Sequence, residues 1–334
     1  MISGIMAWRR WQKITVAAVA LTIGTAGTGL GVKTRDEAHR LVTNPRATRS
    51  QPRETPADRQ LPYEEVAVTT QDGFKLVGWF IPASGGPLVM TVHGYKDNRG
   101  SVLGVAEILH RHGFAVLDLA VRAHDRSDGE VISFGFREMS DLDAWFQYAK
   151  SRPDVDPARI GLFGVSMGGA LAIQYASQNP GIRALVADGA FSSIADTVET
   201  SVTFFTGLPA FPFAPMILFW MEREIGVDSK TIDAKRWIAL ISPRPVFLLQ
   251  GGADEVVSPE SGARLYEAAG QPKELWFDPE LGHTQFLKKR PEEFERRVTD
   301  FFEKYLSSTR RTDVRARQRR ISPARSPNAR NASS

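Results

Sequence analysis

The sequence contains no cysteine among its 334 residues. This absence excludes disulfide bonds, thiolate metal sites, a cysteine nucleophile and a lipid-modified N-terminal cysteine. It does not fix the cellular compartment, because a chain without thiols tolerates both reducing and oxidising surroundings. Histidine is also scarce, at six residues, so few side chains can act as a general base near neutral pH.

Positive and negative charges are nearly balanced along the chain. The formal net charge is +4, with 24% charged and 42% hydrophobic residues, which is ordinary for a globular protein. Because the basic excess is concentrated at the two ends of the chain, no nucleic-acid partner is expected. The sequence leaves the oligomeric state open.

Residues 1–33 have the composition of a targeting segment. Arg9, Arg10 and Lys13 precede an uncharged stretch over residues 14–32, which is close to the shortest length that spans a membrane. An uncleaved anchor and a cleavable signal peptide both fit this pattern. The absence of a small-residue cleavage motif at the right distance favours an anchor. Basic residues flank the stretch on both sides, so the positive-inside rule gives no clear orientation. A short basic N-terminus usually stays inside, which favours an extracytoplasmic domain that would be secreted if the segment were cleaved.

Two other segments have no apolar period. Residues 34–60 are rich in arginine, threonine and proline, which predicts a linker between a membrane and a domain. Residues 307–334 combine many arginines with almost no apolar partners, which predicts a disordered basic tail. Residues 61–306 remain as one folded domain.

Strand-like and helix-like segments alternate within residues 61–306, as in a parallel α/β sheet. Residues 64–70 and 74–81 flank a Gln71-Asp72-Gly73 turn signal, so the sheet is expected to begin with an antiparallel pair. Further strands are expected near residues 88–92, 115–119, 160–163, 184–187, 246–249 and 274–277. Helices are expected near residues 100–112, 136–151, 167–179, 259–269 and 290–306.

The segment Gly164-Val165-Ser166-Met167-Gly168 lies between an expected strand and an expected helix. A serine at such a turn, with a glycine two residues away on each side, is typical of a nucleophile elbow. Side chains at positions 164 and 168 would collide with the neighbouring strand and helix. The N–H groups at the start of the following helix favour a developing oxyanion.

Four motifs make residues 61–306 resemble the α/β-hydrolase superfamily. They are His93-Gly94 after the third strand, the Ser166 elbow after the fifth, Gly251-Gly252-Ala253-Asp254 after the seventh and Gly282-His283 after the eighth. The resemblance implies an α/β-hydrolase fold: an eight-stranded, mostly parallel sheet flanked by helices, with a helical lid insertion. The chain looks like a membrane-anchored serine esterase or peptidase-like hydrolase of that superfamily.

A serine nucleophile needs a base, and the base needs a carboxylate that orients it. The chain order in this fold is serine, acid, histidine, and His283 is the one histidine that follows Ser166. Asp254, in a Gly-x-x-Asp context at the end of the seventh strand, is the expected acid. Three other carboxylates compete with it: Glu255, Asp278 and Asp188.

The oxyanion hole is expected to use two backbone N–H groups. One belongs to Met167, directly after the nucleophile, and the other to Tyr95, after the third strand. Gly94 permits close backbone approach there, and His93 is interpreted as a structural residue of the loop. The loop after the fourth strand departs from the family's Asp-x-Arg-Gly-His-Gly pattern, and a salt-bridge network around His124 is favoured over a metal site.

Residues 196–240 fall where this fold usually inserts a lid. The segment is interrupted by prolines and rich in aromatic side chains, which fits an apolar pocket beneath it as well as simple packing of the lid on the domain. The apolar bias favours an acyl or aryl group over a sugar or a phosphate. The aromatic residues are Phe204, Phe205, Phe211, Phe213, Phe219 and Trp220.

Together these motifs predict a serine hydrolase that cleaves carboxylic esters, thioesters or amides through an acyl-enzyme on Ser166, with an esterase favoured. A small acyl substrate is expected, and no cofactor is needed. A serine aminopeptidase-like peptidase and an acyltransferase form the same acyl-enzyme, so both remain alternatives. A catalytically idle, membrane-tethered binding module is a further alternative, which the complete serine, aspartate and histidine set disfavours.

Overall fold

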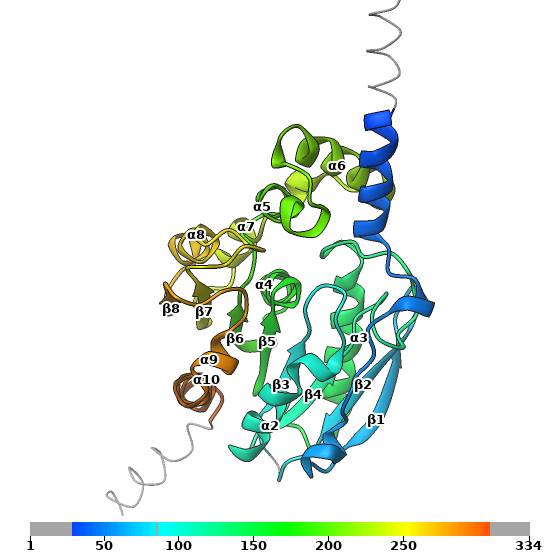
Figure 1. The fold of residues 1–334 in the computed structure, drawn as a ribbon. Coiled ribbons are helices and arrows are strands. Elements are labelled where there is room, and N and C mark those ends of the chain that lie inside the picture. Colours follow the sequence, from blue (N-terminus) through cyan, green and yellow to red (C-terminus); the bar gives the residue numbers. More distant parts are fainter. Residues whose placement is uncertain (1–28, 85, 308–334) are drawn as a thin grey trace, which may run out of the picture.

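The computed structural model describes residues 29–84 and 86–307, and a single sheet runs through the centre of this part of the chain (Figure 1). Its eight strands follow the order β1-β2-β4-β3-β5-β6-β7-β8. The predicted eight-stranded sheet is confirmed. The strands are β1 (Glu64–Thr69), β2 (Lys75–Ile81), β3 (Leu88–Val92), β4 (Ala115–Leu119), β5 (Ile160–Val165), β6 (Ile182–Asp188), β7 (Val246–Gly251) and β8 (Lys273–Asp278).

The sheet is antiparallel at one edge and parallel elsewhere. β1 pairs with β2 and β2 pairs with β4 in antiparallel fashion, whereas every pairing from β4 through β3 to β8 is parallel. The hairpin expected at the start of the sheet is therefore confirmed. All residues of β3 and β4 are buried, which explains why these segments form continuous apolar runs rather than alternating patterns.

Helices cover both faces of the sheet and enclose two separate apolar cores. One core includes residues of α2 (Leu103–Arg111) and α10 (Pro291–Leu306). The other includes residues of α3 (Glu138–Ser151), α4 (Met167–Gln178) and α8 (Glu260–Ala268). Each of these helices matches a helix expected from the sequence. The short α9 (Phe286–Lys289) leads into α10.

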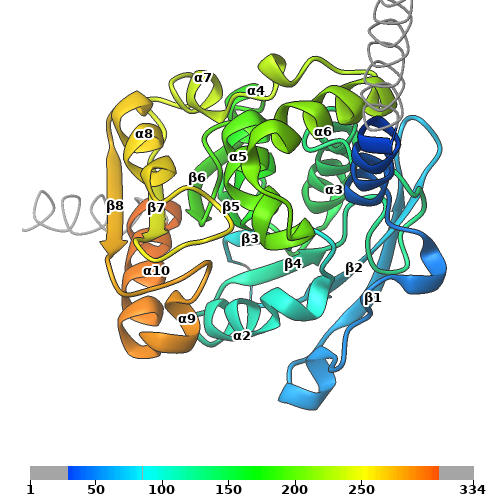
Figure 2. The ribbon, with the colours of Figure 1, turned by 45° about the horizontal axis from the view of Figure 1, so that its top comes forward.

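An insertion between β6 and β7 forms a helical lid, as the sequence predicts. It consists of α5 (Ile194–Thr206), α6 (Ala210–Ile225), η4 (Ser229–Thr231) and α7 (Ala234–Ile238). Gly207, with a φ of 69°, ends α5 in the left-handed conformation that glycine tolerates. α5 and α6 lie over the end of β5 in Figure 2.

Residues 34–60 do not form the linker that the sequence predicts. Residues 29–42 are helical, and this N-terminal helix lies beside α6 in Figures 1 and 2. Thr34, Ala38 and Val42 are fully buried, and their spacing of four residues places them on one face of the helix. Farther on, the buried Arg49 donates hydrogen bonds to the carbonyls of Asn44, Ser127 and Gly129.

The predicted membrane segment and the predicted basic tail lie almost entirely outside the described residues. Among the residues that are described, no single helix has the length and hydropathy of a membrane span. α5 and α6, bent by 109° at their break, satisfy those criteria only when they are taken together.

Candidate active site

Ser166 occupies a strained turn between β5 and α4. Its φ of 55° and ψ of −119° lie outside the regions that side chains favour. A Cβ at Gly164 would stand 2.2 Å from the carbonyl oxygen of Gly168, and a Cβ at Gly168 would stand 2.4 Å from that of His93. Both glycines are therefore required by close backbone approach, as the sequence predicts.

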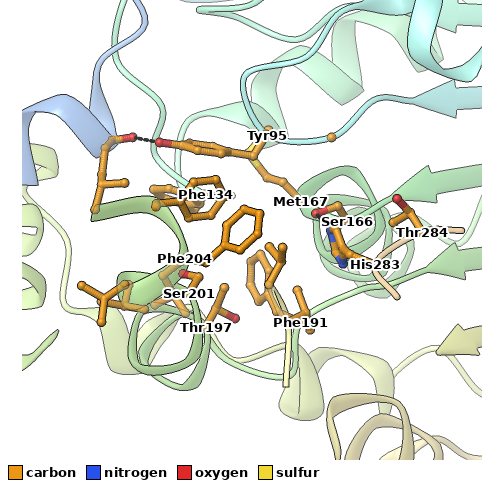
Figure 3. A pocket seen from close by; sticks show the side chains of 18 of the residues that line it. Tyr95, Phe134, Ser166, Met167, Phe191, Thr197, Ser201, Phe204, His283 and Thr284 are labelled. Carbon is orange, nitrogen blue, oxygen red and sulfur yellow. Dashed lines mark hydrogen bonds between the residues drawn. The ribbon is translucent and has the colours of Figure 1, made fainter. Parts of the chain in front are cut away.

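His283 joins Ser166 to Asp254. Its Nε2 lies 2.8 Å from the Ser166 hydroxyl oxygen, and its Nδ1 lies 2.7 Å from Oδ2 of Asp254. Asp254 follows β7, and His283 lies in the loop between β8 and α9, so three loops at the same end of the sheet supply the three side chains. Figure 3 shows Ser166 and His283 side by side at the edge of a cavity.

The Asp254 carboxylate is buried and held in one orientation. Its Oδ1 accepts hydrogen bonds from the backbone N–H groups of Val256 and Val257, both at 2.9 Å. This leaves Oδ2 to accept the Nδ1–H of His283, which fixes the tautomer whose Nε2 faces the serine.

The competing carboxylates have other surroundings. Glu255 is exposed, and Asp278 forms an ion pair with Arg290. Asp188 is buried at the end of β6, where its backbone carbonyl accepts the N–H of Ser166 at 2.7 Å. Within the described residues, its Oδ1 has no hydrogen-bond partner. Burial and the nearby negative charge of Asp254 raise the pKa of Asp188 to about 8, so this carboxyl is held protonated at neutral pH.

The two backbone N–H groups expected to form the oxyanion hole, those of Met167 and Tyr95, lie beside the same cavity as Ser166. Met167 is the first residue of α4, so its N–H has no acceptor within the helix. Tyr95 follows Gly94, where an added Cβ would stand 3.5 Å from Cβ of Ser166. Within residues 29–84 and 86–307, no acceptor lies within hydrogen-bond reach of the Tyr95 N–H. Tyr95, Ser166 and Met167 all line the same cavity.

The two histidines near this loop are buried and structural. His124 Nδ1 lies 2.8 Å from the carbonyl oxygen of Arg122, and its Nε2 accepts the N–H of Lys96 at 3.0 Å. Burial lowers the pKa of both His93 and His124, which favours neutral rings. The predicted salt-bridge network is present, since Asp125 pairs with a buried Arg99 at 2.7 Å. No group of three potential metal-binding side chains occurs in the described part of the chain.

The cavity beside Ser166 has a volume of about 410 Å³ and a mostly apolar lining. Of the lid aromatics expected there, Phe204 and Phe205 line it, whereas Phe211 is 83% exposed. Phe213 and Trp220 pack against the core instead. Other lining residues are not marked by the aromatic pattern. Leu41 and Phe134 come from segments distant in sequence, whereas the rest lie in or next to the expected lid: Phe191, Val198, Val202 and Met221.

Residues 86–224 match a family model described as serine aminopeptidase, S33. An uncharacterised protein of Mycobacterium tuberculosis is 30% identical over 249 residues, which cover 73% of this chain and 79% of that protein. The Arabidopsis thaliana α/β-hydrolase domain-containing protein WAV2 is 28% identical over 306 residues, covering 87% of this chain and 95% of WAV2. Among solved structures, the Pyrococcus furiosus esterase Pf2001 is similar with a TM-score of 0.68 and 29% identity, covering 80% of this chain and 99% of that structure.

The environment of Asp188 predicts a pH-dependent stability. The unfolded chain releases this proton near the usual aspartate pKa of about 4, whereas the folded protein retains it up to about 8. Since the folded state binds more protons between these values, the free energy of unfolding falls as pH rises through this window. The Asp188→Asn variant removes the titration and is expected to raise the thermal midpoint relative to wild type near pH 8 but far less near pH 4.

Thermal denaturation at a series of pH values measures this difference. The same substitution at the exposed Asp300 is the control and should leave the pH profile unchanged. A constant offset between Asp188→Asn and wild type across the series would contradict the assignment of a raised pKa.

Proposed function

Since this chain belongs to the α/β-hydrolase superfamily, we propose that it is a serine hydrolase that cleaves carboxylic ester, thioester or amide bonds, with esters favoured. The observation that carries the proposal is the position of His283, 2.8 Å from the Ser166 hydroxyl and 2.7 Å from Asp254. A nucleophile, a base and an orienting carboxylate in one hydrogen-bonded line are what acyl transfer through serine requires.

The reaction proceeds in two halves. As Ser166 attacks the substrate carbonyl, Nε2 of His283 takes the hydroxyl proton, and Asp254 stabilises the resulting imidazolium. The N–H groups of Met167 and Tyr95 receive the negative oxygen of the tetrahedral intermediate. Collapse breaks the bond to the leaving group, which accepts the proton from Nε2. Water then repeats the sequence on the acyl-enzyme and releases the acid.

The cavity favours an apolar acyl group. Aliphatic and aromatic side chains such as Phe191, Val198 and Phe204 form most of its wall, and burial of apolar substrate surface against them contributes about 25 cal/mol per Å². The chemistry needs no cofactor, because each proton and each negative charge in it is handled by residues of this chain.

Replacement of the nucleophile tests the proposal. The Ser166→Ala variant should fold normally but lose at least about 1,000-fold in kcat on short-chain p-nitrophenyl esters, because no acyl-enzyme forms. It should also resist labelling by a fluorophosphonate. Ser177→Ala, on α4 with its hydroxyl bonded to the Gln174 carbonyl, is the matched control and should retain both activities. Equal labelling of Ser166→Ala and wild type would contradict the assignment of Ser166 as the nucleophile.

A peptidase is the second candidate, and one residue favours it. Asp97 lines the cavity beside Ser166, where its carboxylate would attract the α-amino group of an aminoacyl substrate. The matching family model also describes a serine aminopeptidase.

Asp97→Asn separates the two candidates. In a peptidase, the variant should raise KM for aminoacyl p-nitroanilides about ten-fold, because a charge-assisted contact is lost, while KM for uncharged esters stays the same. The Asn98→Asp/Asp97→Asn double variant keeps the charge one residue away and serves as the control. Wild-type preference for uncharged esters, with no effect of Asp97→Asn on either substrate, would favour the esterase.

The proposal extends to cellular location on sequence grounds alone. The basic start and the uncharged stretch over residues 14–32 support an N-terminal membrane anchor with an extracytoplasmic catalytic domain. The full chain is then expected in the membrane fraction after alkaline carbonate washing, with its domain open to externally added protease. Release of the chain by the wash would contradict anchoring, and protease resistance until lysis would contradict the orientation.

A further inference from the structure

The loop that carries the expected oxyanion N–H is bonded to the end of the N-terminal helix. The Tyr95 hydroxyl donates to the backbone carbonyl of Leu41 at 2.5 Å, as the dashed line in Figure 3 shows. The ammonium group of the next residue, Lys96, donates to the carbonyl of Arg40 at 2.6 Å. Two consecutive side chains of the loop therefore hold two consecutive carbonyls of one helix.

These carbonyls need external partners. The last four carbonyls of a helix have no donor within it, and donors or cations at its C-terminal end are favourable there. Burial raises the pKa of Tyr95, so its hydroxyl remains a donor at any ordinary pH. The pairing thus satisfies the helix end and restrains the loop at the same time.

The helix is a firm support for the loop. Ala38 and Val42 are fully buried in the same apolar core as α4. Arg40 donates to the carbonyl of Phe205 at 3.1 Å, and Nδ1 of His39 lies 2.6 Å from Oε1 of Glu224. The helix therefore also contacts α5 and α6 of the lid. Leu41 itself lines the cavity beside Ser166.

The loop is restrained by the domain as well as by the helix. Lys96 has a φ of 53°, and its N–H is used by Nε2 of His124. The Gly94 carbonyl, which shares its peptide unit with the Tyr95 N–H, lies 2.8 Å from Nδ1 of the buried His93. The Tyr95 side chain adds a second restraint from the cavity side: its ring contacts Phe134 and Phe205, with centroids 5.7 and 5.8 Å away, and its hydroxyl reaches Leu41.

We propose that the helix over residues 29–42 is a working part of the active site. Through its Leu41 and Arg40 carbonyls it holds the Tyr95 hydroxyl and the Lys96 ammonium group, and these positioning groups aim the Tyr95 N–H at the oxyanion. The proposal rests on the proposed function, since it concerns the same reaction. It assigns a role in catalysis to residues that the sequence predicts to be the end of a targeting segment and the start of a linker.

Kinetics of the full-length Tyr95→Phe variant test this role, because the substitution keeps the ring and removes only the hydroxyl. A displaced oxyanion donor should lower kcat on p-nitrophenyl esters about ten-fold, less than the full loss of such a donor, while KM stays within about two-fold. Binding of a trifluoromethyl ketone, which forms the oxyanion adduct, should weaken by the same factor as kcat. Lys96→Met should act in the same direction.

Tyr175→Phe is the matched control. Tyr175, on the far part of α4, is 3% exposed and donates its hydroxyl to Asp143 of α3, so its loss should lower thermal stability without changing kcat. Hydrogen–deuterium exchange provides a structural readout, in which Tyr95→Phe but not Tyr175→Phe accelerates exchange in residues 36–42.

The outcomes separate this role from the proposed function. If wild type reacts with the fluorophosphonate and Tyr95→Phe keeps the wild-type kcat, the positioning role is overturned. A rise in KM at constant kcat also overturns it, because it would assign the hydroxyl to substrate packing. If wild type itself resists the probe, the proposed function fails. Faster exchange in Tyr95→Phe would then show that the hydrogen bond from Tyr95 to Leu41 stabilises the helix but has no role in catalysis.

Discussion

The arrangement of the active site depends on one steric constraint, the contact of the β5–α4 turn with the end of β3. A side chain at Gly168 would meet the carbonyls of Val92 and His93 at 2.4 Å. Because Gly168 has no side chain, α4 can begin directly against the loop that follows β3. The same closeness places Met167 and Tyr95 in the lining of one cavity with Ser166.

Local patterns account for most of what the sequence predicts. Buried strands, the glycines of the elbow and the hairpin at β1–β2 are encoded by neighbouring residues, and chain order alone selects His283 as the partner of Ser166. The N-terminal helix was missed because its buried face consists of Thr34, Ala38 and Val42, which are small or polar and carry a weak apolar period. The sequence does not predict the whole cavity wall, because Leu41 reaches the cavity only when the folded chain brings its helix beside the lid.

Two aspartates near His283 show how surroundings divide the roles of identical side chains. Backbone N–H groups from Val256 and Val257 stabilise the charge of Asp254. Asp188 is also buried but lacks these donors, and it lies near the negative charge of Asp254. Its pKa is therefore raised, and its carboxyl stays protonated at neutral pH. A sequence shows both as aspartates after strands, and only the three-dimensional placement of the donors distinguishes them.

The docked helix over residues 29–42 changes what counts as the smallest complete enzyme. A fragment that starts at residue 61, where the regular α/β alternation begins, would retain Ser166, Asp254 and His283. It would nevertheless open one side of the cavity to water at the place of Leu41 and leave the Tyr95 hydroxyl without its acceptor. The boundary of the catalytic unit therefore lies upstream of the boundary of the sheet.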